Sequence, residues 1–219
     1  MKQVTDTNII INGLISKKLA QIVKNTYDLD ASNIIPLSIY EETRLNLNKL
    51  STILQVFYDE LEKSKDCLKQ LESNHYDYFR QDFPQIYSAF KNLIIKYKYN
   101  KNKEIIREKI TMIAYDIERI LKKLRNRQYP MTENEFYEYS KDPLFIKCYN
   151  DLKFIKNDKD KHHITLCNQY LKVNLKNKSE MTFHTADKND FYYKDHKTKI
   201  ESLISNFYLN IIEIDINEL

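Results

Sequence analysis

LNKLSTILQVFYDELEKSKDCLKQL, residues 47–71, carries apolar residues at intervals of three, four or seven. These positions are Leu50, Leu54, Phe57, Leu61, Leu68 and Leu71, with an interruption only near Ser64. Such spacing places apolar side chains on one face of a helix. A long helix with one apolar face needs partner helices to cover it, so the segment predicts a helical bundle.

Three further segments show the same helical period. Their apolar positions are Ile106, Ile110, Ile113, Ile117, Leu121 and Leu124; Phe145, Cys148, Leu152 and Ile155; and Ile200, Leu203, Phe207 and Ile211. Pro84 and Pro130 separate the periodic segments, Thr132 and Glu135 have capping-box spacing, and Pro143 predicts a helix break. We therefore predict an all-α fold, a bundle of four or more long helices.

Residues 164–184 are the exception to this helical period. The sequence ITLCNQYLKVNLKNKSEMTF, residues 164–183, alternates in places between apolar and polar positions and is split by residues 177–179. It therefore also allows a small β-hairpin. We expect residues 1–36 to form an N-terminal helical arm and residues 37–219 to form the bundle domain.

The composition excludes several kinds of site. One glycine and four prolines leave little turn chemistry, which argues against glycine-rich phosphate loops and dinucleotide fingerprints. Three cysteines without CxxC spacing predict neither a disulfide framework nor a zinc site, and they fit a reducing compartment. The apolar run from Ile9 to Ile11 is too short for a signal peptide or a membrane span. We expect a soluble, cytoplasmic protein with no membrane partner.

Positive charge is concentrated in one part of the chain. The net charge is +4 overall, but Lys91 to Arg127 contains twelve Lys and Arg residues against four Asp and Glu residues. Tyrosines are interleaved with these cations: Tyr97, Tyr99, Tyr115 and Tyr129. Such a pattern can follow a nucleic-acid backbone and stack on bases, and it is also typical of a solvated helix face.

The sequence FIKNDKDKHH, residues 154–163, combines cations, an amide and two adjacent histidines. Basic groups favour the C-terminal end of a helix without any functional role. If one helix continues through the segment, Lys156 and His163 lie on nearly the same side, with Asn157 beside them. An imidazole can transfer a proton and a cation can hold a phosphate. These groups suffice to cleave RNA without a metal, because the ribose 2′-OH supplies the nucleophile.

The sequence KNDKDKHH, residues 156–163, resembles the motif of the HEPN superfamily. That motif has Arg, a polar residue that is often Asn, and then His. Here Lys156 stands in the Arg position, Asn157 in the polar position, and His162 or His163 follows. The resemblance implies an all-helical, metal-independent endoribonuclease that acts as a dimer, or a catalytically degenerate relative of such an enzyme. It also implies a bacterial or phage-related defence or toxin system.

On this hypothesis His162 or His163 moves the proton, and Lys156 and Asn157 hold the scissile phosphate. The residues expected to steer RNA are Arg125, Arg127, Lys159 and Lys161. The expected partners are RNA and either a second copy of the chain or another protein. A non-enzymatic helical protein-interaction module is the alternative.

Metal chemistry has little support in the sequence. The histidines considered, with Asp187 or Asp195 as further ligands, are His162, His163, His184 and His196. They show neither HExxH nor Cys-His spacing, so we predict no metal site and no cofactor. The acidic pairs Glu41–Glu42 and Asp158–Asp160 lie in charge-rich segments typical of solvated faces.

Overall fold

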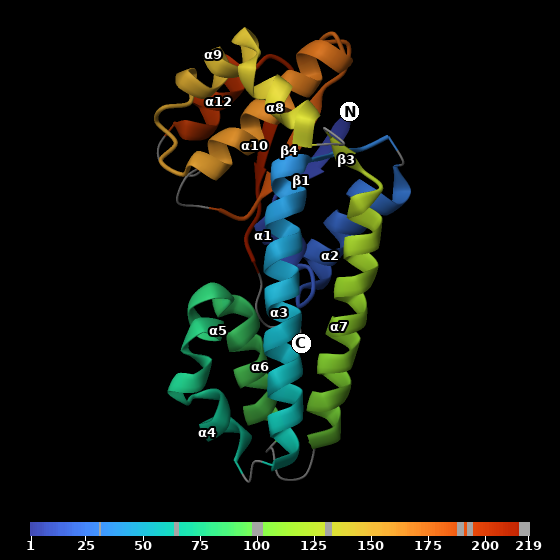
Figure 1. The fold of residues 1–219 in the computed structure, drawn as a ribbon, viewed down its shortest axis with the longest axis vertical. Coiled ribbons are helices and arrows are strands. Elements are labelled where there is room, and N and C mark those ends of the chain that lie inside the picture. The colour runs from blue at the N-terminus through green and yellow to red at the C-terminus, as the bar shows by residue number, and fades with distance from the viewer. Residues whose placement is uncertain are drawn as a thin grey trace.

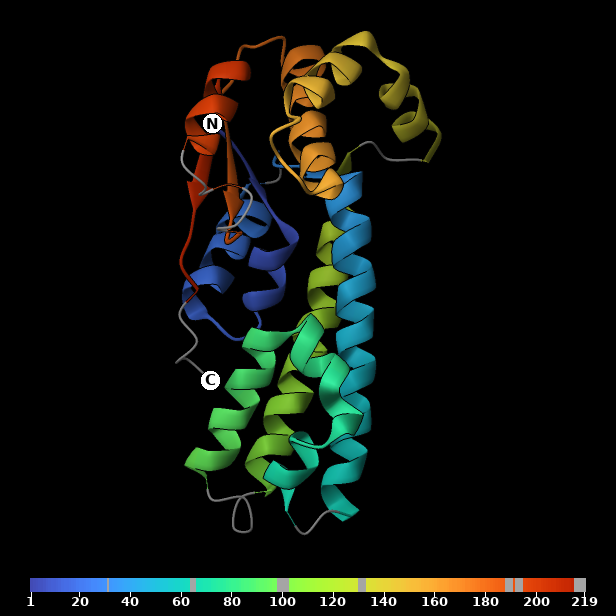
Figure 2. The ribbon, with the colours of Figure 1, turned by 90° about the vertical axis from the view of Figure 1, so that its left-hand side faces the viewer.

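Two long helices organise the molecule. A computed structural model describes residues 1–30, 32–63, 66–97, 103–129, 133–187, 191 and 195–214. Helices α3 (Leu37–Lys63) and α7 (Lys103–Arg125) lie side by side (Figure 1). A small sheet and helices α8–α10 and α12 lie at one end of this pair, and α4–α6 lie at the other (Figure 2).

The remaining elements are short. The helices are α1 (Thr7–Asn12), α2 (Lys17–Lys24), α4 (Cys67–Leu71), α5 (Asp77–Asp82), α6 (Pro84–Lys96), α8 (Glu133–Lys141), α9 (Pro143–Asp151), α10 (Asp158–Gln169) and α12 (His196–Leu203). Non-α helical turns are η1 (Asn25–Leu29), η2 (Asn74–Tyr76) and η4 (Tyr170–Asn174). The strands are β1 (Lys2–Thr5), β2 (Ile35–Pro36), β3 (Gln128–Tyr129), β4 (Met181–Thr185) and β5 (Phe207–Ile211).

The helical period predicted α7 and most of the first stripe on α3, but Leu68 and Leu71 of that stripe lie on the separate helix α4. Leu50, Leu54, Phe57 and Leu61 on α3 are buried, as are Ile106, Ile110, Ile113 and Ile117 on α7. The predicted break at Pro143 is also confirmed, because α8 ends at Lys141 and α9 begins at Pro143. Ser64, Tyr99, Pro130 and Thr132, invoked above, lie outside the described residues.

The fold is mostly helical, but parallel strands make the all-α prediction incomplete. β4 lies between β1 and β5 and pairs in parallel with both, and β2 pairs in parallel with β3. Among the described helices only α3 and α7 exceed twenty residues, so a bundle of four or more long helices is not confirmed. None of the described helices is both long and apolar enough to cross a lipid bilayer.

The β-hairpin expected near residues 164–184 was wrong. Most of that segment is helical, in α10 and η4, and its apolar residues Ile164, Cys167 and Leu171 are buried at helical spacing. Its strand, β4, finds both partners far away in the sequence. Parallel partners need long connections, so no local alternation could have revealed them.

The last predicted helical stripe was only partly right. Ile200 and Leu203 lie on α12, but Phe207 and Ile211 belong to β5. The helix ends at Leu203 because Ile204 is extended, with φ of −117° and ψ of 105°, and Asn206, with a left-handed φ of 62°, directly precedes β5.

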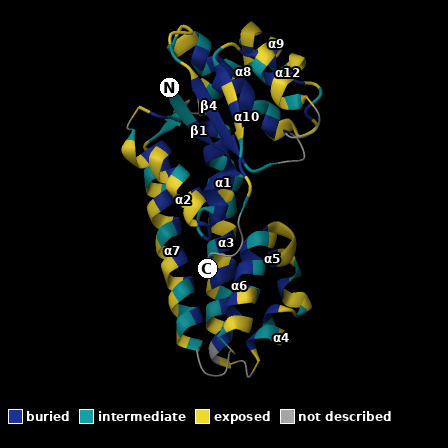
Figure 3. Cartoon of the chain, turned by 180° about the vertical axis from the view of Figure 1, so that it is seen from behind, coloured by how far each residue is buried: buried dark blue, intermediate teal, exposed yellow. Residues whose placement is uncertain are grey.

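Residues 1–36 contain α1, α2 and η1, but they begin with strand β1, which pairs with β4 from Lys2↔Met181 to Thr5↔His184. The N-terminal segment is therefore joined by hydrogen bonds to the C-terminal part of the chain. The division of the chain at residue 36 stays a prediction. Figure 3 shows β4 as buried along its length, which places the sheet in the core.

Candidate functional site

An acidic hollow lies at the carboxyl ends of β1 and β4. It has a volume of about 560 Å³, and we call it the acidic hollow. Its lining residues come from α1, α3, α5, α6, α10 and the segments after β1 and β4: Asp6, Thr7, Asn8, Ile11, Asn12, Glu42, Asn46, Asp82, Phe83, Gln85, Asn157, Asp160, Ala186, Asp187 and Ile214. In parallel sheets, ligands commonly bind beyond the carboxyl ends of the strands.

Asp6 follows β1 directly and is held in a fixed orientation. Its Oδ1 accepts a hydrogen bond from the Thr7 amide at 2.7 Å, and its Oδ2 accepts bonds from Asn8 Nδ2 and Thr185 Oγ1, both at 2.8 Å. The residue is only 4% exposed. Burial raises the pKa of Asp6, and the charge on His163 and the bond from Thr185 offset only part of that rise. The fold thus keeps a carboxyl group at a place where its negative charge is unfavourable.

Helix α10 brings Asp160 and His163 to the same side of the hollow. Asn157 caps the helix by accepting a hydrogen bond from the Lys159 amide at 3.0 Å, which fixes where the first turn begins. Residues three apart share a helix face, so Asp160 and His163 both turn inward. They are 6% and 1% exposed. One ligand atom from each of Asp6, Asp160 and His163 lies within 4.8 Å of the others.

Glu42 on α3 completes this cluster and is paired with His163. The Glu42 Oε2 atom is 3.0 Å from His163 Nε2 and accepts a bond from Thr7 Oγ1 at 3.1 Å. Its Oε1 accepts from Lys159 Nζ at 3.2 Å. Although burial raises the pKa of Glu42, the bond to His163 and the charges on His163 and Lys159 lower it to about 2. Glu42 is therefore ionised at neutral pH.

Ser38 fixes the ring of His163 from the other side. The Ser38 hydroxyl lies 2.8 Å from His163 Nδ1, so both ring nitrogens have hydrogen-bond partners. With Nε2–H donating to Glu42, Nδ1 can accept the Ser38 proton. With both nitrogens protonated, the Ser38 oxygen accepts. In either state His163 orients Glu42 within the acidic hollow.

The end of β4 contributes through Asn8 and Asp187. The Ala186 amide donates to Asn8 Oδ1 at 2.9 Å, so α1 is tied to the segment after β4. The Asp187 amide donates to Thr185 Oγ1 at 3.0 Å, while that hydroxyl donates to Asp6. Asp187 therefore lies beside Asp6 at neighbouring strand ends and lines the same hollow.

Carboxylates outnumber cations in the described lining of the acidic hollow. Five carboxylates line it, from Asp6, Glu42, Asp82, Asp160 and Asp187, and no Lys or Arg occurs among the described lining residues. Lys159 pairs with Glu42 from outside this lining, and Lys49 pairs with Asp82. Carboxylate and amide oxygens are the ligands that hard divalent cations such as Mg²⁺ and Mn²⁺ prefer. Asp6, Asp160 and His163 have ligand atoms close enough together to hold such a cation, and Glu42, Asp187 and Asn8 line the hollow nearby.

The two adjacent histidines of the sequence motif lie in different surroundings. His162 is half-buried against the rings of Tyr149, Phe145 and Phe136, with centroid distances of 4.9, 5.8 and 6.1 Å. Burial lowers the pKa of His162, and the charge on His163 lowers it further. His163 instead contacts Glu42 and Ser38. The two imidazoles therefore do not form one site.

The other predicted catalytic residues lie at the start of α10. The helix begins at Asp158, so Lys156 precedes it and the expected helical relation between Lys156 and His163 does not hold. Lys156 is exposed, and Asn157 both caps α10 and lines the acidic hollow.

The residues predicted to steer RNA are spread over several environments. Lys159 binds Glu42, whereas Lys161 Nζ binds Asp158 at 2.6 Å. Arg125 is exposed at the end of α7, and Arg127 Nη2 donates to the Tyr27 carbonyl at 3.1 Å. Lys159 and His163 are brought together because both contact Glu42.

Sequence reasoning missed the acidic residues that the fold gathers. The prediction that the acidic pairs lie on solvated faces was wrong for Asp160, which is buried, and for Glu42, which is partly buried. One signal was present: Asp6 and Asp187 each closely follow a short segment that forms a strand. Comparisons with protein-family models, curated proteins and solved structures find no match to this chain.

Proposed function

We propose that the protein is a divalent-cation-dependent phosphodiesterase that hydrolyses nucleic acid in the acidic hollow. The observation that carries this proposal is the convergence of Asp6 and Asp160, each more than nine-tenths buried, beside Glu42 at the carboxyl edge of a parallel sheet. Burying several carboxylates together is costly unless positive charge compensates them. A divalent cation supplies that charge.

The donor set favours phosphoryl chemistry. Magnesium sites in proteins commonly use a few carboxylates and complete their coordination with substrate phosphates and water. A bound cation of this kind polarises a phosphoryl oxygen and lowers the pKa of a coordinated water. Asp6 and Asp160 provide fixed ligands, Glu42 is kept ionised by His163, and Asn8 orients Asp6.

The proposed reaction is hydrolysis of a phosphodiester. The oxygen of water forms a bond to phosphorus, and the bond from phosphorus to one nucleoside oxygen breaks. The departing oxygen leaves as an alcohol after it takes up a proton, and the water loses one. No oxidant or reductant is needed, and the products are a phosphomonoester and a free hydroxyl end.

Nucleic acid is the proposed substrate class because of the charge outside the hollow. The segment from Lys91 to Arg127 is rich in cations, and several cations of α7, such as Lys122 and Arg125, are exposed. Such side chains, which lie outside the lining of the acidic hollow, can attract the phosphates of a polynucleotide. RNA remains the expected form, and a matched DNA tests that choice.

The direct test is cleavage of labelled single-stranded RNA and DNA of the same sequence by the purified chain. We expect cleavage with Mg²⁺ or Mn²⁺ and none in EDTA. Asp6→Asn and Asp160→Asn should each lower the rate by roughly 100-fold or more, since even outer-shell partners of metal ligands typically cost 10- to 100-fold. Mn²⁺ binding, followed by electron paramagnetic resonance, should weaken in the same two variants.

Asp158→Asn is the matched control. Asp158 lies two residues from Asp160 on the same helix, but it is exposed and pairs with Lys161. This variant should keep both cleavage and Mn²⁺ binding. Equal losses in Asp158→Asn and Asp160→Asn would contradict the proposal.

The metal-independent HEPN-like ribonuclease stays a second hypothesis, and the same assay separates it. It requires cleavage in EDTA that survives Asp6→Asn and disappears in a His162→Ala, His163→Ala double variant. The geometry supports it less, because His163 is buried against Glu42 and His162 lies among aromatic rings. Absence of any cleavage, with a stable protein partner recovered, would favour the non-enzymatic interaction module.

A further inference from the structure

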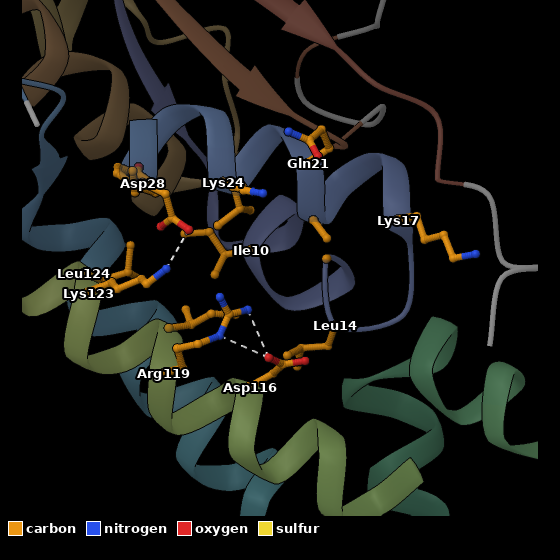
Figure 4. A pocket seen from close by; sticks show the side chains of 15 residues that line it. Ile10, Leu14, Lys17, Gln21, Lys24, Asp28, Asp116, Arg119, Lys123 and Leu124 are labelled. Atoms are coloured by element: carbon orange, nitrogen blue, oxygen red, sulfur yellow. Dashed lines mark hydrogen bonds and ion pairs between the residues drawn. The ribbon is translucent and has the colours of Figure 1, made fainter. Parts of the chain in front are cut away.

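A second pocket lies between α2, η1 and α7, on the other side of α1 from the acidic hollow. It has a volume of about 400 Å³, within the range of small-molecule sites, and we call it the basic pocket. Its lining residues are Ile10, Gly13, Leu14, Lys17, Ala20, Gln21, Val23, Lys24, Tyr27, Asp28, Asp116, Arg119, Ile120, Lys123 and Leu124 (Figure 4).

The walls of the basic pocket combine aliphatic surface with cations. The aliphatic surface includes Ile10 and Leu14 from the α1 region and Ile120 and Leu124 from α7. Four cations and two carboxylates line the same space, which leaves an excess of two positive charges. This distribution suits a ligand with an apolar body and an anionic head group.

Two of the four cations are already paired within the pocket. Lys123 Nζ lies 2.5 Å from Asp28 Oδ2, and Arg119 Nη2 donates to Asp116 Oδ1 at 2.9 Å (Figure 4). Lys24 is exposed and has no hydrogen-bond or ion-pair partner within the described part of the chain. Lys24 is therefore the cation best placed to receive an anionic head group.

The close approach of α1 and α2 depends on the only glycine of the chain. A Cβ atom at Gly13 would lie 3.2 Å from the Ile9 and Ile10 carbonyl oxygens and 3.3 Å from the Ala20 amide nitrogen. These distances are tighter than ordinary van der Waals contacts, and all three atoms belong to the backbone. Glycine therefore lets the turn between α1 and α2 form this wall of the pocket.

We propose that the basic pocket binds a small amphipathic anion, an aliphatic chain that ends in a carboxylate or a phosphate. An aliphatic body is favoured over a nucleobase because Tyr27 is the one aromatic residue among the described residues of the lining. Its hydroxyl is engaged inward, where it accepts a hydrogen bond from the Thr5 amide at 3.1 Å. Stacking of bases requires aromatic platforms, which this lining does not offer. This proposal does not depend on the activity of the acidic hollow.

The test is calorimetric titration of the full chain with laurate and dodecyl phosphate, each below its micellar concentration, and with dodecanol below its solubility limit. We expect saturable binding of at least one of the two anions at one site per chain. Tighter binding of laurate would identify the ligand as a fatty carboxylate, and tighter binding of dodecyl phosphate would identify it as a phosphorylated lipid fragment. Dodecanol should bind at least about tenfold more weakly, because it lacks the charge that the cations attract.

Substitutions on α2 locate the site. Lys24→Ala should weaken anion binding by about threefold to tenfold and leave dodecanol unaffected. Ala20→Phe should remove binding of laurate, dodecyl phosphate and dodecanol, because the larger side chain fills the pocket. An unchanged circular dichroism spectrum would show that this variant folds. Lys18→Ala, which removes an exposed cation of the same helix outside the lining, is the control and should bind as the wild type does. No saturable binding of either anion, or equal binding by wild type, Lys24→Ala and Ala20→Phe, would overturn the proposal.

Discussion

At the scale of single residues, the pair of Glu42 and His163 determines how the acidic hollow responds to pH. The folded state lowers the pKa of Glu42 from 4.5 to about 2, so folding favours the ionised form. The resulting stabilisation is complete above the usual pKa of 4.5 and is lost as the pH falls through about 2. Acid should therefore weaken the fold partly through this one carboxylate.

The corresponding prediction compares wild type with Glu42→Gln by urea unfolding between pH 7 and pH 2.5. At pH 7 the variant should be less stable by roughly 2 to 4 kcal/mol, because it leaves the buried His163 without its charged partner. The difference should narrow below pH 4.5 as Glu42 of the wild type takes up a proton in the unfolded state. Glu41→Gln removes a partly exposed carboxylate paired with Arg44 and should cost no more than about 1 kcal/mol. A difference between wild type and Glu42→Gln that does not change with pH would show that the contact is not an ion pair.

Single residues also show why sequence alone did not identify the acidic hollow. Glu42 directly follows Glu41 in the sequence, and Asp160 is separated from Asp158 by one lysine. In each pair, one side chain points outward and the other points inward only once the helix packs against its neighbours. The direction depends on contacts between elements far apart in the sequence: His163 on α10 contacts Glu42 on α3 across 121 residues, and Thr185 on β4 contacts Asp6 across 179 residues. Residue type predicted the chemistry available, but not which carboxylates meet.

At the scale of elements, substitutions of Asn157 can distinguish two roles for this residue: N-cap of α10 or ligand of a substrate phosphate. Its side chain accepts a hydrogen bond from the Lys159 amide and sets the first turn of α10, on which Asp160 lies. Asn157→Ala should destabilise the chain by about 1 kcal/mol, the usual cost of losing an N-cap. It should also weaken Mn²⁺ binding, because the position of Asp160 depends on that turn.

The cap interpretation predicts rescue by a different capping residue. Asn157→Ser should restore both stability and Mn²⁺ affinity to near the wild-type values, since Ser is an equally good N-cap. The thermal midpoint and Mn²⁺ titrations of the three proteins provide the comparison. Failure of Ser to restore Mn²⁺ binding while stability recovers would show that the Asn157 amide acts on the ligand itself.

Elements differed in how well the sequence predicted them, for physical reasons. α3 and α7 are long, and each repeats its apolar positions over several turns, so the period is unambiguous. β5 has only five residues, and its apolar positions happened to continue the spacing of α12. β1 and β4 pair across about 180 residues, so their partnership depends on tertiary structure and leaves no local signal.

At the scale of the whole molecule, α1 separates the two proposed sites and contacts both. Asn8, Ile11 and Asn12 line the acidic hollow, whereas Ile10 and the adjoining Gly13 line the basic pocket. A second connection runs through Tyr27, which lines the basic pocket and accepts the Thr5 amide hydrogen bond directly before Asp6. A ligand that fixes this wall should also fix the position of Asp6.

We therefore predict positive coupling between the sites, which rests on both proposals. Saturating laurate should raise Mn²⁺ affinity about threefold to tenfold, and Mn²⁺ should raise laurate affinity by the same factor, because binding linkage is reciprocal. Tyr27→Phe should reduce the coupling below about twofold by removing the acceptor of the Thr5 amide, with little change in laurate binding alone. Tyr76→Phe removes another buried tyrosine hydroxyl, one bonded to Glu60, and should leave the coupling intact. Equal coupling in wild type and Tyr27→Phe would exclude the tyrosine as the connection, and no coupling in wild type would mean that the two sites bind independently.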